Sequence, residues 1–126
     1  MAVELGLKGR AETVVDESNT AAAIGSGAVP VFSTPMLVAL MEAASVDAIQ
    51  GRLDPDQGSV GTYVATTHES ATPMGKRVWA EAELTEIDRR ALTFTVTGYD
   101  EKGIVGRGTH KRFIIYPQKF LEKNRA

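Results

Sequence analysis

The sequence predicts an α+β fold in which a curved antiparallel β-sheet wraps a long central helix. Residues 35–50 are apolar on nearly every side, which predicts a helix that other elements surround. Later segments alternate apolar and polar residues, a pattern typical of antiparallel strands with one face in water. A helix that needs cover and a sheet with one apolar face can bury each other, so we expect the sheet to curl around the helix.

The central helix has clear boundary signals. Ser33 and Thr34 each offer a hydroxyl that can cap the first turn, and Pro35 suits the first helical position. We expect the helix to run to about Gln50, where Gly51 can end it.

The strands are separated by short polar connections, at residues 88–90 and 101–103 for the later ones. Gly106 and Gly108, in the last strand, would allow the chain to bend or another segment to approach closely. Strands are expected at residues 8–15, 58–70, 76–87, 91–100 and 104–117.

The composition bounds the possible classes of function. The 126 residues are expected to form a single domain, residues 1–126, with a solvated tail from about residue 120. A net charge of −2 offers no basic footprint for nucleic acid. Without cysteine, and with its two histidines far apart, the chain is not expected to form disulfides or bind a metal. Lacking a secretory signal and an apolar run of about 18 residues, it is expected to be cytoplasmic and not in a membrane.

Glu42 is the first residue that stands out by its position, because it is a carboxylate in the middle of the apolar helix. Burying such a group is costly unless a partner pairs with it. Glu42 either lies on a narrow solvent-facing stripe with Ser45, one turn away, or serves a functional site.

Two further side chains could join Glu42. Alternation places His68 on the same strand face as Val60 and Val64, so we expect it to point toward the helix. It is either a site residue or a histidine bonded to a backbone carbonyl. Thr34 is either the helix cap or a site hydroxyl. His110, in the polar run GTHKR, is expected at the surface.

A hydroxyl, an imidazole and a carboxylate are the ingredients of acyl-transfer chemistry. With these residues in view, the chain resembles the hotdog-fold acyl-CoA thioesterases, and within them the fluoroacetyl-CoA thioesterase-like group. The resemblance runs from about residue 29 to residue 115. It rests on the spacing T-P-x-x-x-x-x-x-E from Thr34 to Glu42, and on G-T-x-V-x-x-x-H-x-x-A-T-P-x-G from Gly61 to Gly75.

The resemblance implies a hotdog fold that works as a homodimer, with sites at the interface, and it leaves pairing of dimers into tetramers open. It implies hydrolysis of an acyl-CoA thioester by Thr34, Glu42 and His68, with the backbone N–H of Gly61 polarising the thioester carbonyl. Phe32 and Ser33, just before the helix, are expected to line the substrate site. No cofactor is expected, because coenzyme A is part of the substrate.

The chain departs from the group in the segment before the helix. The fluoroacetyl-specific enzyme has phenylalanines there that gate its pocket, whereas Phe32 is the only aromatic residue among residues 22–32 here, and residues 25–28 are small. We therefore expect a different or broader acyl group. A non-catalytic acyl-CoA-binding module is the alternative function. A hotdog hydratase is a third, but its aspartate–histidine pair does not occur here in its usual local motif.

Overall fold

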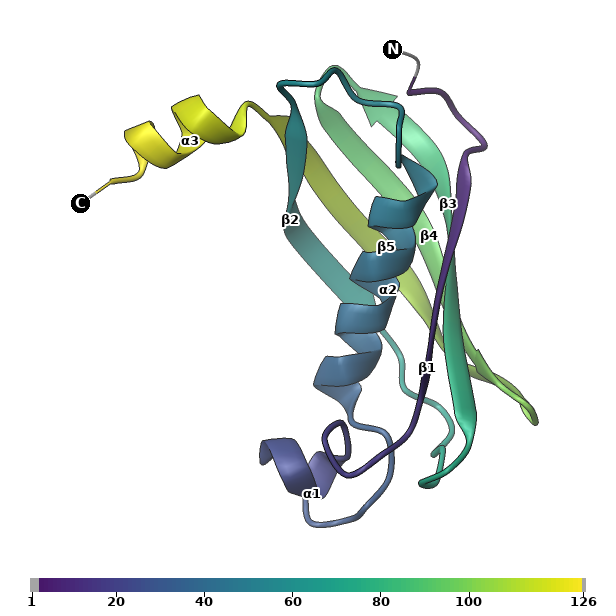
Figure 1. Ribbon diagram of the computed structural model, residues 1–126. Helices are drawn as coiled ribbons and strands as arrows, with labels where there is room; N and C mark the ends of the chain where they lie inside the picture. The colour runs from purple at the N-terminus through teal and green to yellow at the C-terminus, as the bar shows by residue number, and fades with distance from the viewer. Residues whose placement is uncertain (1–2, 126) are drawn as a thin grey trace.

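Five antiparallel strands form a single sheet in the order β1-β3-β4-β5-β2 in the computed structural model, which describes residues 3–125 (Figure 1). The sheet curves around the long helix α2, as predicted. Connections of two residues join β3 to β4 and β4 to β5, so these three strands form a meander at the centre of the sheet. In chain order the elements are β1 (Lys8–Val14), α1 (Ala21–Ile24), α2 (Thr34–Ala48), β2 (Gly58–Thr66), β3 (Arg77–Asp88), β4 (Ala91–Asp100), β5 (Gly103–Ile115) and α3 (Pro117–Lys123).

Helix α2 begins where its sequence predicts. Ser33 is the cap, since its hydroxyl accepts a hydrogen bond of 3.3 Å from the backbone N–H of Met36. The Thr34 side chain is therefore free for another role. The helix ends at Ala48, shortly before Gly51, whose φ of 75° is the left-handed conformation that glycine adopts easily.

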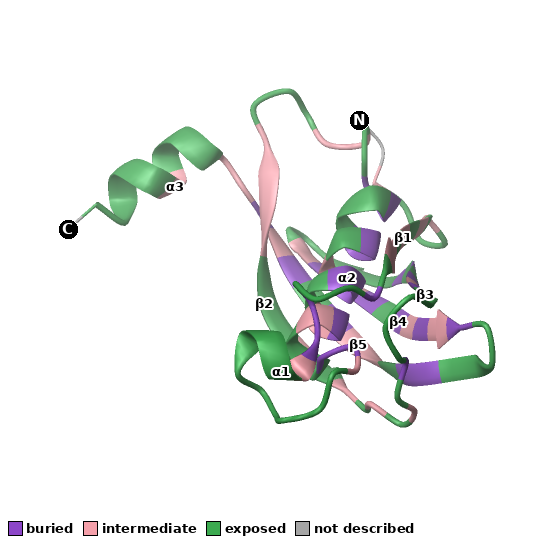
Figure 2. Cartoon of the chain, turned by 60° about the horizontal axis from the view of Figure 1, so that its bottom comes forward, coloured by how far each residue is buried: buried purple, intermediate pink, exposed green. Residues whose placement is uncertain are grey.

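The sheet covers only one side of α2 (Figure 2), so the prediction of a helix surrounded on all sides was wrong for the single chain. The uncovered side is nevertheless apolar, and it exposes Ala39, Ala43 and Val46. The covered side carries the buried residues Leu37, Leu40, Met41, Ala44, Ser45 and Ala48.

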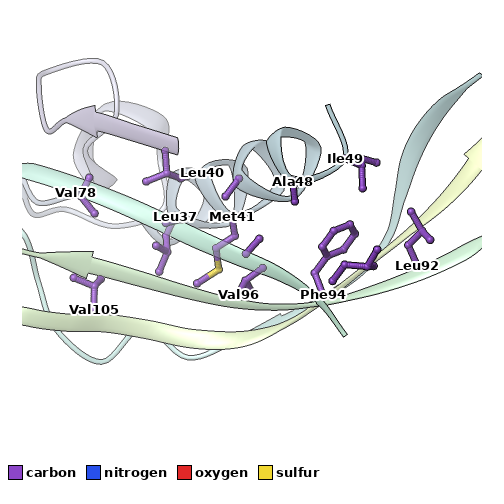
Figure 3. Packing of buried hydrophobic residues seen from close by; sticks show 14 of the residues in the cluster. Leu37, Leu40, Met41, Ala48, Ile49, Val78, Leu92, Phe94, Val96 and Val105 are labelled. Atoms are coloured by element: carbon purple, nitrogen blue, oxygen red, sulfur yellow. The ribbon is translucent and has the colours of Figure 1, made fainter. Parts of the chain in front are cut away.

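The hydrophobic core lies between that covered side and the inner face of the sheet (Figure 3). Leu37 and Met41 project from the helix toward the sheet, Met41 toward Val96, while Phe94 lies beneath the Ala48 end of the helix. The side chains of Leu37, Met41, Phe94 and Val96 are fully buried. Burying side chains of this size contributes about 1.5–3 kcal/mol each, which makes this layer the main source of stability.

Strand β2 contains a β-bulge that changes which residues face the helix. Its register against β5 shifts between Gly61 and Tyr63. Gly61 pairs with Arg112 and Val64 pairs with His110, so both face inward. The prediction that Val60 and Val64 share one face was therefore wrong, because a bulge adds a residue and reverses the alternation.

Gly106 and Gly108 allow a close approach, as predicted. A methyl group on Gly106 would collide with the carbonyl oxygen of Thr67, and one on Gly108 with that of Ala65. The two glycines therefore let the end of β2 and the segment after it lie directly against β5.

The C-terminal helix α3 stands clear of the sheet, on the side of the edge strand β2 (Figure 1). Residues 121–125 are exposed, as predicted for the tail, although much of the tail is helical. Phe120 is half-buried, and Ala126 lies outside the described residues. Among residues 3–125, no helix has the length and apolar character needed to cross a membrane.

Candidate active site

Thr34 and His68 form a hydrogen-bonded pair at the start of α2. Thr34 Oγ1 lies 2.7 Å from His68 Nδ1. The helix start fixes the threonine, and the segment after β2 carries the histidine across to it. Because Ser33 supplies the helix cap, the Thr34 hydroxyl can serve the imidazole. The interpretation of Thr34 as the cap was therefore wrong, and His68 points toward the helix as expected.

The other ring nitrogen of His68 is buried without a partner. Its Nε2 atom is the only buried side-chain nitrogen or oxygen within residues 3–125 that lacks a hydrogen bond. Burial lowers the pKa of His68 below its usual value of 6.5, while the nearby backbone of Ser70 opposes this shift in part. The imidazole is therefore neutral at pH 7, with one nitrogen held by Thr34 and the other buried without a hydrogen-bond partner.

A groove of about 280 Å³ opens beside this pair. Phe32 and Ser33, the expected substrate-binding residues, contribute to its wall, although both side chains are almost fully buried. The groove is lined by Ala21, Ser26, Val31, Phe32, Ser33, Thr34, His68, Glu69, Ser70 and Ala71.

Glu42 lies in a different place, against the bulged part of β2. A methyl group on Gly61 would stand 2.9 Å from Glu42 Oε2 and 3.2 Å from the ring of His110. The same position is 3.5 Å from Arg112 Nη1. The absence of a side chain at Gly61 therefore leaves a small space bounded by a carboxylate, an imidazole and a guanidinium group. Ser45 is buried and bonds the carbonyl of Met41, so Glu42 does not share a solvent-facing stripe with it.

His110 is fully buried, which corrects the prediction that it lies at the surface. It faces inward because β5 alternates, and the glycines at 106 and 108 lie on the same face. Arg112 Nη1 donates a hydrogen bond of 3.2 Å to His110 Nε2, and His110 Nδ1 donates one of 2.8 Å to the carbonyl of Tyr63. Burial lowers the pKa of His110, and the charge of Arg112 lowers it further, whereas the hydrogen bond to the Tyr63 carbonyl and the charge of Glu42 oppose this shift in part.

Arg112 is held firmly from two sides. Its Nε donates to Ser59 Oγ at 2.8 Å, and its Nη2 donates to the Ser59 carbonyl at 3.1 Å. Burial lowers the pKa of Arg112, whereas the negative charge of Glu42 raises it. Ser59, His110 and Arg112 thus form a rigid cationic wall facing Glu42. We did not predict these residues from the sequence, although the alternation along β5 places His110 and Arg112 on the face of its two glycines.

The three expected catalytic residues therefore form two groups in one chain. Thr34 and His68 are in direct contact at the helix start, whereas Glu42 and Gly61 lie further along the helix. Glu42 comes eight positions after Thr34, which corresponds to about 12 Å along a helix axis. A single chain does not bring the carboxylate to the Thr34–His68 pair along this axis.

Comparison with known proteins identifies the family. The family model for fluoroacetyl-CoA-specific thioesterases matches residues 15–118. This chain belongs to that family. A fluoroacetyl-CoA thioesterase of Streptantibioticus cattleyicolor is 42% identical over 95 residues, which are 75% of this chain and 68% of the relative.

Solved structures agree with this assignment to the thioesterases. A variant of the fluoroacetyl-CoA-specific thioesterase FlK, in complex with fluoroacetate and CoA, superposes with a TM-score of 0.87 at 35% identity. The match covers 94% of this chain and 99% of that structure. A thioesterase superfamily member from Thermus thermophilus superposes with a TM-score of 0.90 at 27% identity, covering 98% and 92% of the two chains. The protein is thus a hotdog-fold thioesterase, as its sequence predicts.

Proposed function

We propose that this thioesterase hydrolyses an acyl-CoA to the free acid and CoA at a site built by two copies of the chain. One copy would contribute Thr34 and His68, and the second copy Glu42 and Gly61. The observation that carries this proposal is the separation of the two groups in one chain, next to a sheet edge that is open.

That open edge belongs to β2, which pairs only with β5. Two identical edges pair across a two-fold axis, and such pairing is necessarily antiparallel. In this pairing, the end of β2 in one copy, which leads to His68, lies alongside the beginning of β2 in the second copy, which contains Gly61. A second copy would also offer cover for the exposed apolar side of α2. Both features favour a homodimer.

In the proposed mechanism, His68 Nδ1–H donates a hydrogen bond to Thr34 Oγ1, which leaves the lone pair of Nε2 to act as a base. Nε2 takes a proton from water as the water oxygen attacks the thioester carbon. The carbon–sulfur bond then breaks, and the same proton passes to the CoA sulfur. Glu42 stabilises the imidazolium that forms between these steps. The N–H of Gly61 stabilises the negative carbonyl oxygen, a contribution that is often among the largest.

This mechanism uses only side chains, backbone and water, so we propose that it needs no cofactor beyond the CoA of the substrate. A cytoplasmic location would fit a chain without cysteine.

The acyl group is proposed to be broader than fluoroacetyl. Residues 22–30, which precede the helix, are exposed and carry no aromatic side chain. Gly25 adopts a left-handed φ of 78° at the end of α1, a conformation that glycine adopts easily. Such a segment cannot close on a small acyl group with an aromatic face.

Thiol release from a panel of acyl-CoAs, from acetyl and fluoroacetyl to octanoyl, tests the reaction. We expect hydrolysis of several short acyl groups without a strong preference for fluoroacetyl. Absence of thiol release from every member of the panel would overturn the proposed function.

Mixing two inactive variants tests the shared site. His68→Ala and Glu42→Gln chains are expected to be inactive alone. A mixed dimer keeps one site with both His68 and Glu42, so co-refolding the two variants should restore activity. If the site lay within one chain, the mixture would stay inactive.

A further inference from the structure

Helix α3 is the part of the molecule that the proposed function leaves without a role. It follows β5 directly, and none of its residues is buried. Figures 1 and 2 both show it projecting from the body beyond β2. Leu121 is 65% exposed on it. A helix of seven residues is too short to be stable by itself in water, so its position suggests that it packs against something outside the chain.

The helix and the residue after it are cationic. Lys119, Lys123 and Arg125 are all exposed, and Glu122 is the only carboxylate among residues 117–125. None of the three cations forms an ion pair with another residue of the described range 3–125. The Lys119 ammonium lies 5.8 Å from the centre of the Tyr116 ring.

The candidate active site, by contrast, lacks a free cation of its own. No lysine or arginine lines the groove beside Thr34 and His68. Glu69, which lines the groove, is paired with the guanidinium group of Arg107 at 3.1 and 3.3 Å. Coenzyme A carries phosphate groups, which proteins bind with arginine and lysine. The groove alone does not supply them.

The sheet register indicates where α3 would lie in a dimer. Ile115, the last residue of β5, pairs with Gly58, the first residue of β2. In an antiparallel β2–β2 pair, the beginning of one strand lies beside the end of the other. Helix α3 therefore leaves one copy about two strand spacings, or roughly 10 Å, from the end of the other copy's β2. That end leads to His68 and the groove.

We propose that α3 is an arm that reaches the second copy and supplies Lys119, Lys123 and Arg125 to the phosphate groups of the CoA bound there. This inference rests on the proposed function and on pairing through β2, and it adds the origin of the substrate's phosphate contacts. Leu121 and Phe120 anchor the arm on the second copy, and the three cations face the mouth of its groove.

Two substrates separate phosphate binding from catalysis. Replacing Lys119, Lys123 and Arg125 together by alanine should raise the KM for acetyl-CoA about tenfold, since three charge-assisted contacts are lost. The KM for acetyl-pantetheine, which lacks the phosphates, should not change, and kcat should stay the same for both. The matched control replaces Lys8, Lys76 and Lys102 by alanine, which removes the same charge elsewhere. An equal rise in KM for the two substrates, or an equal rise in the control, would overturn the proposal.

A mixed dimer tests whether the arm acts across the interface. One chain carries His68→Ala with a normal arm, and the other carries normal His68 with the three arm substitutions. The working His68 then faces the normal arm of the other chain, so the KM for acetyl-CoA should return to the unmodified value. A KM that stays high would place the arm at its own chain's site and overturn the proposal. Activity in the pure His68→Ala protein would instead contradict the proposed function.

Discussion

The two halves of the candidate site are held in very different ways. The Thr34–His68 pair lies at a groove near the helix start, joined by one hydrogen bond and leaving His68 Nε2 without a partner. In the wall beside Gly61, His110 and Arg112 are buried and tightly bonded, and Arg112 alone donates three hydrogen bonds. The Thr34–His68 pair therefore still has a nitrogen that can form a hydrogen bond, whereas Arg112 in the wall already donates three.

This difference indicates that the Thr34–His68 pair takes part in the reaction, whereas the wall holds other groups in place. An unpartnered buried nitrogen costs free energy in the folded state, so its retention suits a group that bonds only when substrate or a second copy arrives. A fully bonded cationic wall changes little during a reaction and can hold a carboxylate and a backbone N–H in place. Substitutions in the first half should therefore reduce activity with little effect on stability, whereas those in the wall should reduce stability.

The largest effect is expected at Glu42, where the two halves would meet. Glu42→Gln keeps the shape of the side chain but removes the charge that stabilises the His68 imidazolium, so kcat should fall about 10³-fold. Thiol release measures this loss, and the exposed residue Glu81 provides a matched Glu→Gln control. A Glu42→Gln protein with normal kcat would remove Glu42 from the mechanism.

A large effect on stability is expected at Arg112. Arg112→Leu leaves the buried Nε2 of His110 and the half-buried polar groups of Ser59 without their partner, at a cost of about 2–3 kcal/mol of unfolding free energy. Urea denaturation measures it. Arg90→Leu is the control, since Arg90 is exposed and lies over the ring of Phe113. Equal losses in the two variants would show that the wall is not specially stabilised.

Thr34 should show the opposite behaviour. Thr34→Val removes the hydrogen bond to His68 Nδ1, so kcat should fall about tenfold, while the unfolding midpoint changes little because Thr34 is exposed. Thr34→Ser keeps the hydroxyl and should keep most of the activity. If valine and serine variants had the same kcat, the hydrogen bond would have no part in catalysis.

The smallest effects are expected from pH. His68 must be neutral to act as a base, and burial lowers its pKa from 6.5. The rate should therefore rise with pH and reach half its maximum below pH 6.5. A half-maximum above pH 6.5 in a pH–rate profile would contradict the proposed role of His68.

His110 should affect stability rather than the rate. Its pKa is also lowered by burial, so the unfolded chain binds a proton more readily than the folded one. The stability that His110 contributes is present above about pH 6.5 and is lost as the pH falls toward its folded pKa. His110→Gln should reduce the loss of unfolding free energy between pH 7.5 and pH 5.5. An unchanged loss would show that His110 is not the group responsible.

Much of this architecture was predictable because local chemistry decides it. The apolar run, the hydroxyls at 33 and 34 and the following proline predict helix α2 to within about two residues at either end. Alternation and the short polar connections likewise predict β3, β4 and β5. The packing of the helix on the sheet follows because each element has an apolar face that is stable only when the other removes it from water.

Other features depend on contacts that no local pattern contains. Ser33 and Thr34 are both good caps, and only the position of His68 shows why Ser33 takes that role. A bulge after Gly61 reverses the faces of β2, which simple alternation cannot reveal. His110 lies in a polar run, and it is buried because its strand face turns toward the helix.

By itself, the sequence predicted helix α2, the five strands and their order along the chain, since these follow from short-range propensity and spacing. It also singled out Thr34, Glu42 and His68 as candidate site residues. The tertiary structure decided which of those side chains meet. It joined Thr34 to His68, enclosed Glu42 with Gly61, His110 and Arg112, and left the two groups apart along one helix. The physical reason is geometric. Each residue of a helix advances about 1.5 Å along the axis, so two side chains eight positions apart lie about 12 Å apart along it, even when their chemistry would suit a direct contact.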